Sequence, residues 1–248
     1  MTPASEDSSD RAAPTDFDPC ASTVQVHRFI GIDVGAESIK AVELVRAGGG
    51  YRWTRRRCVE HQKDVGTSLG TLLAEWGWHG VSGAAATGRL GRQLDLPQIP
   101  VKQAQIGGAR HLLGDGPMTV VSIGSHGFSI LELRENGLEI FRENSRCSQG
   151  TGNFLRQLIG RFSLTIEQAD ALCATVRTPA VLSGRCPVIL KTDMTHLANK
   201  GEDRAAILAG LFDAVCENVL VLIKPGVCPG RVILIGGVAR SGRVQATF

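Results

Sequence analysis

A pattern of strand and turn signals occurs twice along this 248-residue chain and limits what the chain can fold into. Each copy begins with a short apolar run, passes a glycine-containing turn, and continues with two more strand-like runs joined by a second turn. The runs lie at 29–34, 38–45 and 51–59 in the first copy and at 120–123, 129–133 and 138–142 in the second. Such a duplication predicts an α/β protein made of two related domains.

Helices are predicted between and after the two copies, because apolar residues recur there at helical spacing. We expect helices at 65–77, 101–113, 150–162, 165–173 and 203–224, and further strands at 81–86 and 231–235.

Three parts of the chain are expected. Residues 1–26 are polar and almost free of bulky apolar side chains, which predicts a disordered leader. The first domain is expected at 27–117 and the second at 118–248. The sequence stops at Phe248, soon after the expected start of another helix, so we expect a truncated C-terminus.

Composition argues against several classes of partner. Lys and Arg number 27 against 24 Asp and Glu, and this net charge of +3 is too small to predict a nucleic-acid-binding protein. No apolar run is long enough for a membrane helix, and the N-terminus lacks the basic and apolar parts of a signal segment. We therefore expect a cytoplasmic protein without a membrane or nucleic-acid partner.

The seven cysteines of such a chain are expected to be reduced thiols, core residues or metal ligands. No Cys-x-x-Cys or His-Glu-x-x-His motif occurs, so a zinc site within one chain has no support. A cluster shared between chains stays open. We expect Cys173, Cys216 and Cys228 to lie in the core and Cys58 to pack within its strand.

The first glycine turn has the groups of a phosphate and magnesium site. Asp33 leaves the first strand and is followed by Gly35, Ser38 and Lys40. Glycine lets the backbone approach an oxyanion, Ser38 and Lys40 can bind it, and a carboxylate can hold a hydrated Mg²⁺ ion. A plain hairpin with turn-favouring Asp and Gly is an equal alternative for this motif taken alone.

Four motifs together resemble those of one ATPase family. They are Gly31 to Gly35 followed by Lys40, Ala86-Thr87-Gly88, Cys147 to Leu155, and Gly236-Gly237-Val238-Ala239. Through them the chain resembles the BadF/BadG/BcrA/BcrD ATPases, which are activators of 2-hydroxyacyl-CoA dehydratases and subunits of benzoyl-CoA reductase. The resemblance implies an actin-like (ribonuclease H-like) ATPase fold, with nucleotide bound in a cleft between two related domains.

The resemblance also implies roles for particular residues. Those expected to bind ATP and Mg²⁺ are Asp33, Gly35, Ser38 and Lys40 in the first turn, Gly124 in the second turn, and Gly236 and Gly237 on the adenosine side. Asp33 and Lys40 are expected to act in catalysis as well. Gly150 and Gly152 would let the backbone pack close to a cluster or to phosphates.

An iron–sulfur centre follows from the same resemblance. The family forms a homodimer or a dimer of related subunits with one 4Fe–4S cluster between them, and ATP hydrolysis drives electron delivery to an acyl-CoA dehydratase or benzoyl-CoA-type reductase. Cys147 and Cys186 correspond to the two ligands from each subunit. Cys147 precedes a predicted helix, whose positive end would stabilise an anionic cluster. Cys186 precedes Pro187, which suits either a helix start or a rigid turn.

The chain departs from the family at both phosphate turns. The family's second turn reads Asp-Ile-Gly-Gly-Gln-Asp, whereas residues 122–127 are Ser-Ile-Gly-Ser-His-Gly. The lost carboxylate would help to position Mg²⁺ or the attacking water. Glu37 replaces a small hydroxyl residue and puts a negative charge near the phosphates unless it points away. Two alternatives therefore stay open: a nucleotide-binding pseudo-ATPase subunit without turnover, and a small-molecule kinase of the same superfamily, for which we find no carboxylate base.

Two surface features are also expected. Four arginines predict a basic strand edge, which is either solvated or a docking place for an acidic partner or a CoA phosphate; they are Arg52, Arg55, Arg56 and Arg57. Trp76 and Trp78 are expected to close the core of the first domain, with an exposed Trp78 as the alternative.

Overall fold

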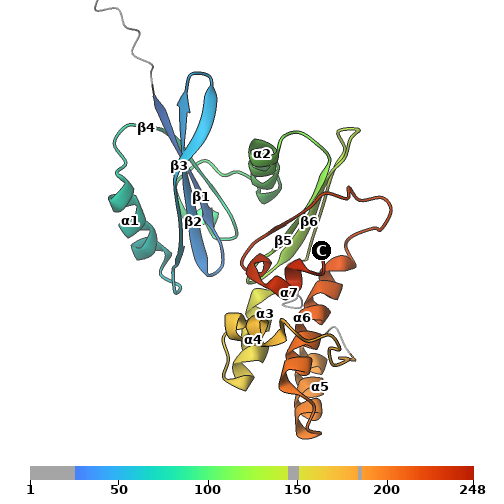
Figure 1. Cartoon of the computed structure of the whole chain (residues 1–248). Coiled ribbons are helices and arrows are strands. Elements are labelled where there is room, and N and C mark those ends of the chain that lie inside the picture. The colour runs from blue at the N-terminus through green and yellow to red at the C-terminus, as the bar shows by residue number, and fades with distance from the viewer. Residues whose placement is uncertain (1–25, 145–150, 184–185) are drawn as a thin grey trace, which may run out of the picture.

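Two four-stranded sheets form the framework of the computed structural model, which describes residues 26–144, 151–183 and 186–248 (Figure 1). The first sheet contains, in spatial order, β3 (Gly50–Glu60), β2 (Ser38–Ala47), β1 (His27–Val34) and β4 (Val81–Thr87). The second contains β7 (Glu139–Asn144), β6 (Phe128–Leu133), β5 (Met118–Ile123) and β8 (Val232–Ile235). In each sheet three strands form an antiparallel meander and the fourth lies parallel to the first, so the predicted duplication is confirmed.

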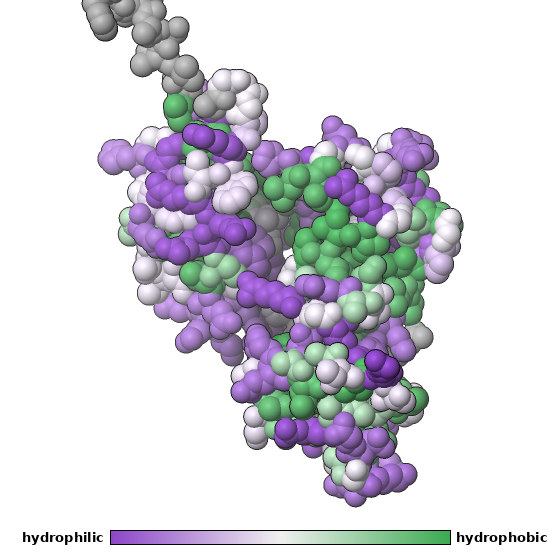
Figure 2. Space-filling model, viewed as in Figure 1, coloured by the Kyte–Doolittle hydropathy of each residue, from purple (hydrophilic) through white to green (hydrophobic). Residues whose placement is uncertain are grey.

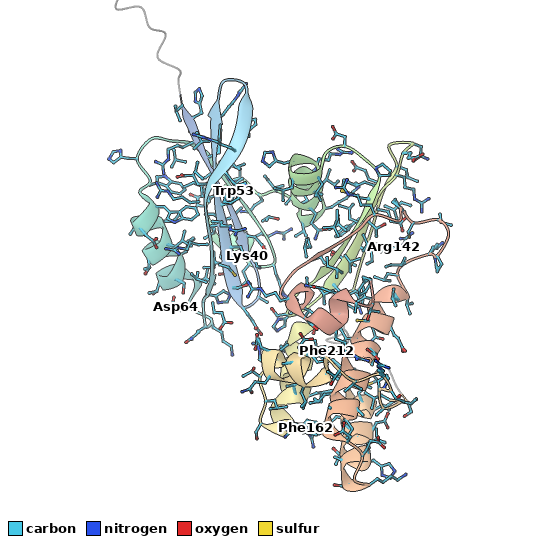
Figure 3. All side chains as sticks on the ribbon, in the orientation of Figure 1. Lys40, Trp53, Asp64, Arg142, Phe162 and Phe212 are labelled. Atoms are coloured by element: carbon cyan, nitrogen blue, oxygen red, sulfur yellow. The ribbon has the colours of Figure 1, made fainter. Side chains whose placement is uncertain are left out.

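The second sheet is covered on both faces, which explains why β5 and β6 are buried along almost their whole length. On one face, α2 (Val101–Leu113) packs Ile106 near Met118 and Val120. The other face meets a helical layer built around Phe212 (Figure 3). That layer consists of α3 (Gly152–Ile159), α4 (Ile166–Cys173), α5 (Pro187–Asn199), α6 (Arg204–Leu220) and the short α7 (Gly242–Gln245).

The first sheet has one well-covered face. The helix α1 (Val65–Trp76) begins at Asp64, whose carboxylate accepts a hydrogen bond from the Thr67 backbone N–H at 3.0 Å. Its apolar face, including Leu72 and Trp76, packs on the buried residues of β1 and β2. The outer strand β3 is exposed along nearly all of its length. We call β1–β4, α1 and the η1 turn (Gly91–Gln93) the first lobe, and α2 with everything after it the second lobe.

Most predicted elements are present, and the largest addition is α5. Of the two alternatives for Pro187, the structure shows the helix start: Pro187 occupies the first turn of α5, where its missing N–H costs nothing. The predicted helix at 150–162 is described from Gly152 and tightens into the η2 turn (Gly160–Phe162). The predicted helix at 203–224 is shorter, Arg204–Leu220. Among the described residues, no helix has the length and apolar character needed to cross a bilayer.

Expectations about packing come out differently for three residues. Cys173 and Cys216 are buried as predicted, but Cys58 is exposed, because it lies on the outer strand of the first sheet. Cys228 is only partly buried. Trp76 is buried, whereas Trp78 is 46% exposed, so the alternative is confirmed for Trp78.

A buried glutamate lies at the same place in each copy of the repeat. Glu43 in β2 follows Asp33 by the same number of residues as Glu132 in β6 follows Ser122. Glu43 pairs with Arg28 at 2.5 Å and accepts a hydrogen bond from the Thr54 hydroxyl at 2.7 Å. Buried carboxylates need such partners, because an unpaired charge in the core is very costly.

Glu132 likewise has three side-chain partners. Arg142, labelled in Figure 3, and Arg134 both donate to its carboxylate, Arg134 at 2.5 Å, and the Cys228 thiol lies 3.1 Å from Oε1. Burial raises the pKa of Glu132, but the hydrogen bonds from Arg142, Arg134 and Cys228 outweigh it and lower the pKa to about 2.

We expect Glu132→Gln to lower the free energy of unfolding by about 3 kcal/mol at pH 7, because both guanidinium groups lose their anion. Urea unfolding measures this, and Glu135→Gln, at an exposed position of the following turn, is the matched control. Since the folded-state pKa is lowered from 4.5 to about 2, the wild type holds this stability above about pH 5 and loses it as the pH falls toward 2. If the free energies of unfolding of the wild type and Glu132→Gln differ by the same amount at every pH, this assignment is contradicted.

Candidate functional site

The first turn brings together the four residues predicted for it. Asp33 at the end of β1 and Lys40 at the start of β2 are paired in register, and Nζ of Lys40 lies 3.0 Å from Oδ2 of Asp33. The Gly35 N–H donates to the Ser38 carbonyl at 2.9 Å and closes the turn. Lys40 extends from the face of the sheet turned away from α1 (Figure 3). The turn therefore presents a carboxylate and an ammonium group within one small area.

His61 contacts the backbone of this turn, a role that the sequence did not predict. Its buried ring accepts a hydrogen bond from the Lys63 backbone N–H at Nδ1, at 3.1 Å. The proton is therefore on Nε2, which lies 3.3 Å from the Gly35 carbonyl oxygen. The backbone N–H of His61 also donates to the Glu37 carbonyl, at 3.1 Å. Gly35 lies 26 residues away in sequence, so no local spacing could reveal the contact.

Gly88 lies in close contact with the Asp33 carboxylate. It follows β4, which runs parallel to β1 with Thr87 beside Asp33. Its φ is +91°, and a Cβ at this position would lie 2.2 Å from Oδ1 of Asp33 and 2.6 Å from the Val34 carbonyl oxygen. Only glycine fits there. The Ala86-Thr87-Gly88 motif thus acts by letting the end of β4 approach the first turn.

The second turn is built from three segments in contact. The Gly124 N–H donates to the Gly127 carbonyl, and the Gly152 N–H at the start of α3 donates to the Gly124 carbonyl, both at 2.9 Å. Gly236 follows β8 with φ +95°, and a Cβ there would lie 2.3 Å from the Ile123 carbonyl oxygen. Gly237 comes next and begins the η3 turn (Val238–Arg240). The structure therefore brings the second turn, the α3 start and the Gly-Gly loop together, while Gly150 lies outside the described residues.

A furrow separates the two lobes (Figure 2), and the two turns come close to each other through Glu37. Glu37 of the first turn does not point toward Lys40 but reaches Arg156 of α3, with 2.5 Å between carboxylate and guanidinium. His126 of the second turn has its Nδ1 4.0 Å from the other oxygen of Glu37. A cavity of about 270 Å³ lies beside the first turn. It is lined by Thr87, Gly88, Arg92, Gln98, Ile99, Pro100 and Val101.

The structure describes one of the two predicted cluster ligands. Cys186 is an exposed free thiol at the N-cap of α5, a position that suits an anionic ligand. Cys147 lies outside the described residues. Within residues 26–144, 151–183 and 186–248, no three His, Cys, Asp or Glu side chains are grouped so that they could hold a metal ion.

Comparison with known proteins identifies the family. A sequence model of the BadF/BadG/BcrA/BcrD ATPase family matches residues 30–248, and the chain belongs to this family. It is 25% identical over 130 residues to the (R)-2-hydroxyglutaryl-CoA dehydratase activating ATPase of Acidaminococcus fermentans, covering 52% of this chain and 50% of that protein. It is 27% identical over 122 residues to a subunit of the benzoyl-CoA reductase of Thauera aromatica, covering 48% of this chain and 43% of that protein. These two alignments thus span half or less of each relative.

A solved structure shows the same fold over a larger part of the chain. It is the activator of the 2-hydroxyisocaproyl-CoA dehydratase from Clostridium difficile with bound ADPNP, which matches with a TM-score of 0.77 at 21% identity. The match covers 89% of this chain and 84% of that one. The predicted actin-like α/β fold is thereby confirmed.

We expect Gly88→Ala to destabilise the protein more than Gly80→Ala. Both positions have positive φ, +91° and +72°, but a Cβ at 80 would meet nothing within 4 Å. Gly80→Ala should therefore lower the free energy of unfolding by about 1 kcal/mol, the cost of placing alanine at a positive φ. Gly88→Ala should lower it by about 2 kcal/mol more, because Asp33 and Val34 must move. Equal loss in urea unfolding would show that the close approach at Gly88 is unimportant.

Proposed function

We propose that this chain is an ATP-dependent activator that delivers low-potential electrons to an acyl-CoA dehydratase or a benzoyl-CoA-type reductase in the cytoplasm. The observation that supports it best is the pair of glycine turns, one on each lobe, which come close to each other through Glu37. Such turns bind phosphate groups through backbone N–H groups, and two of them can hold a nucleotide between two domains. The names of the relatives supply the partner class and the coupling to ATP.

The first turn would bind the phosphates and Mg²⁺. The Asp33 side chain is 38% exposed and therefore reachable by a hydrated ion, and Lys40 beside it would neutralise phosphate charge. The ion would supply charge stabilisation on the phosphate oxygens when bound. Gly124 would contribute the second phosphate turn, and Gly236 and Gly237 would let the adenosine side approach the backbone. Asp33 and Lys40 are our candidates for the catalytic groups.

Cys147 and Cys186 would hold one 4Fe–4S cluster between two copies of this chain, or between it and a related subunit. The described ligand fits this role, because the Cys186 thiol is exposed and lies at the positive end of a 13-residue helix. Two cysteines per chain cannot complete a four-cysteine site, so binding requires a dimer. The cluster would supply one-electron chemistry at low potential. Gly152, and Gly150 before it, would allow close backbone packing near Cys147.

A second candidate function is nucleotide binding without turnover. The observation that favours it is the second turn, where residues 122–127 contain no carboxylate. Hydrolysis of phosphoanhydrides depends on positioned charge, so the loss weakens catalysis more than binding. ATP hydrolysis stimulated by a reductant or by the partner enzyme would exclude this alternative. A small-molecule kinase would need a carboxylate base that faces a substrate pocket, whereas Asp33 is paired with Lys40 and Glu37 with Arg156.

The cluster is tested by iron content and electron paramagnetic resonance after reconstitution without oxygen. We expect about four irons per dimer in the wild type and loss of the signal in Cys147→Ser and Cys186→Ser. Cys58→Ser is the matched control, because Cys58 is also an exposed thiol but lies on the first sheet. A wild type that holds no iron, or a Cys58→Ser variant that loses it equally, would contradict the assignment.

Nucleotide binding is tested with a non-hydrolysable ATP analogue in calorimetric titrations. Asp33→Asn and Lys40→Met should weaken binding in the presence of Mg²⁺ by roughly tenfold, because each removes a charge that contacts the ion or the phosphates. Lys200→Met, at the exposed end of α5, should leave the affinity unchanged. Equal affinities in all four proteins would place the nucleotide elsewhere.

A further inference from the structure

Glu37 connects the two lobes through a single carboxylate. It extends from the first turn, with 25% of its side chain exposed, and the two basic side chains near its carboxylate belong to the second lobe. Arg156 is on α3, and His126 is in the turn between β5 and β6. Throughout the described part of the chain, the ion pairs that join one lobe to the other are those of Glu37. Glu37 is thus the residue through which charged side chains of the two lobes meet.

The surroundings of this carboxylate are those of an anion site. The Arg156 guanidinium donates to one oxygen at 2.5 Å, and Nδ1 of His126 lies 4.0 Å from the other. That nitrogen is buried and makes no hydrogen bond, although a small shift of either group would form one. The N-terminus of α3 packs against the same turn, where the Asn153 N–H donates to the Ser125 carbonyl at 2.9 Å. The second lobe therefore offers positive charge and an unused polar nitrogen to an anion.

The first turn keeps Glu37 in this position. Its carbonyl accepts a hydrogen bond from the backbone N–H of the buried His61, at 3.1 Å, so the peptide that follows β1 is fixed to the first lobe. Asp33 is already neutralised by Lys40 at 3.0 Å. Glu37 thus remains the carboxylate of this turn that is directed to the other lobe.

We propose that Glu37 acts as an internal anion, which holds the lobes together in the absence of ligand and occupies the place of a nucleotide phosphate on Arg156 and His126. This inference rests on the proposed nucleotide site. A phosphate group entering between the turns carries more negative charge than a carboxylate and offers more acceptor oxygens, so it displaces Glu37 from Arg156. Arg156 and His126 are then phosphate-binding residues, and Glu37 sets how readily the site accepts its ligand.

The lobe contact is tested first, without nucleotide, by small-angle X-ray scattering. Glu37→Gln and Arg156→Gln should each increase the radius of gyration of the chain. The matched control is Arg161→Gln, which removes an arginine of the η2 turn that bonds Thr195 and not Glu37. The double variant Glu37→Arg with Arg156→Glu should restore the wild-type value, because the ion pair is re-formed with its signs exchanged. A wild-type radius in both single variants would overturn the contact.

Competition with phosphate is tested by titration with the non-hydrolysable ATP analogue and, separately, with inorganic phosphate. Glu37→Gln should bind the analogue about threefold more tightly than the wild type, and Arg156→Gln should bind it several-fold more weakly, the size expected for one partly exposed charge contact. Unchanged affinity in Glu37→Gln would overturn the competition. If neither the wild type nor any variant binds the analogue, the proposed function fails, while the scattering comparison still decides the lobe contact. Enhanced binding of inorganic phosphate alone would assign the site to the free ion rather than to a nucleotide.

Discussion

The structure depends on one constraint: at the ends of two parallel strand pairs, β1 with β4 and β5 with β8, one backbone segment must approach another very closely. In the first lobe, Gly88 after β4 lies against Asp33 and Val34, and in the second, Gly236 after β8 lies against Ile123. Both glycines have positive φ, +91° and +95°, and a side chain at either would overlap neighbouring atoms. The same device therefore occurs in both copies of the repeat. It lets the fourth strand of each sheet approach the turn that follows the first strand, so both turns are built against the same kind of neighbour.

The two lobes share this arrangement but differ in how their sheets are covered. In the second lobe, α2 and the helical layer around Phe212 cover both faces, and β5 and β6 are accordingly buried on both sides. In the first lobe β3 stays exposed, and aromatic and arginine side chains lie on it, with Arg56 5.1 Å from the centre of the Trp53 ring. Both lobes nevertheless contain a buried glutamate paired with arginine, Glu43 in the first and Glu132 in the second. Each of these ion pairs links strands or turns of its meander within the protein interior.

Local patterns were enough to predict the strands, most helices and the positions of the glycine turns. They failed where the answer lies in contacts distant in sequence. Glu37 and Arg156 are 119 residues apart and His61 is 26 residues from Gly35, so neither contact leaves a periodic or spacing signal. Cys58 looked like a strand residue that packs inward, but burial on an outer strand depends on which strands the covering helix reaches, and α1 packs mainly on β1 and β2. The proximity of Asp33 and Lys40 was predictable because both lie within one hairpin.

The segment between β4 and α2 returns to the strand that it has just left. The Ala86 N–H donates to the Pro97 carbonyl at 2.9 Å, and the Ile99 N–H donates to the Ala86 carbonyl at 2.8 Å, so the chain is fastened to the edge of the first sheet until Ile99. Pro100 then precedes α2 with an extended backbone. The linker between the lobes, from Ile99 to the start of α2, is therefore only a few bonds long. Any relative movement of the lobes at this linker is a rotation about a short pivot and not the free motion that a long flexible linker allows. Such a pivot converts a small displacement at the turns into a larger one at the far ends of α5 and β3.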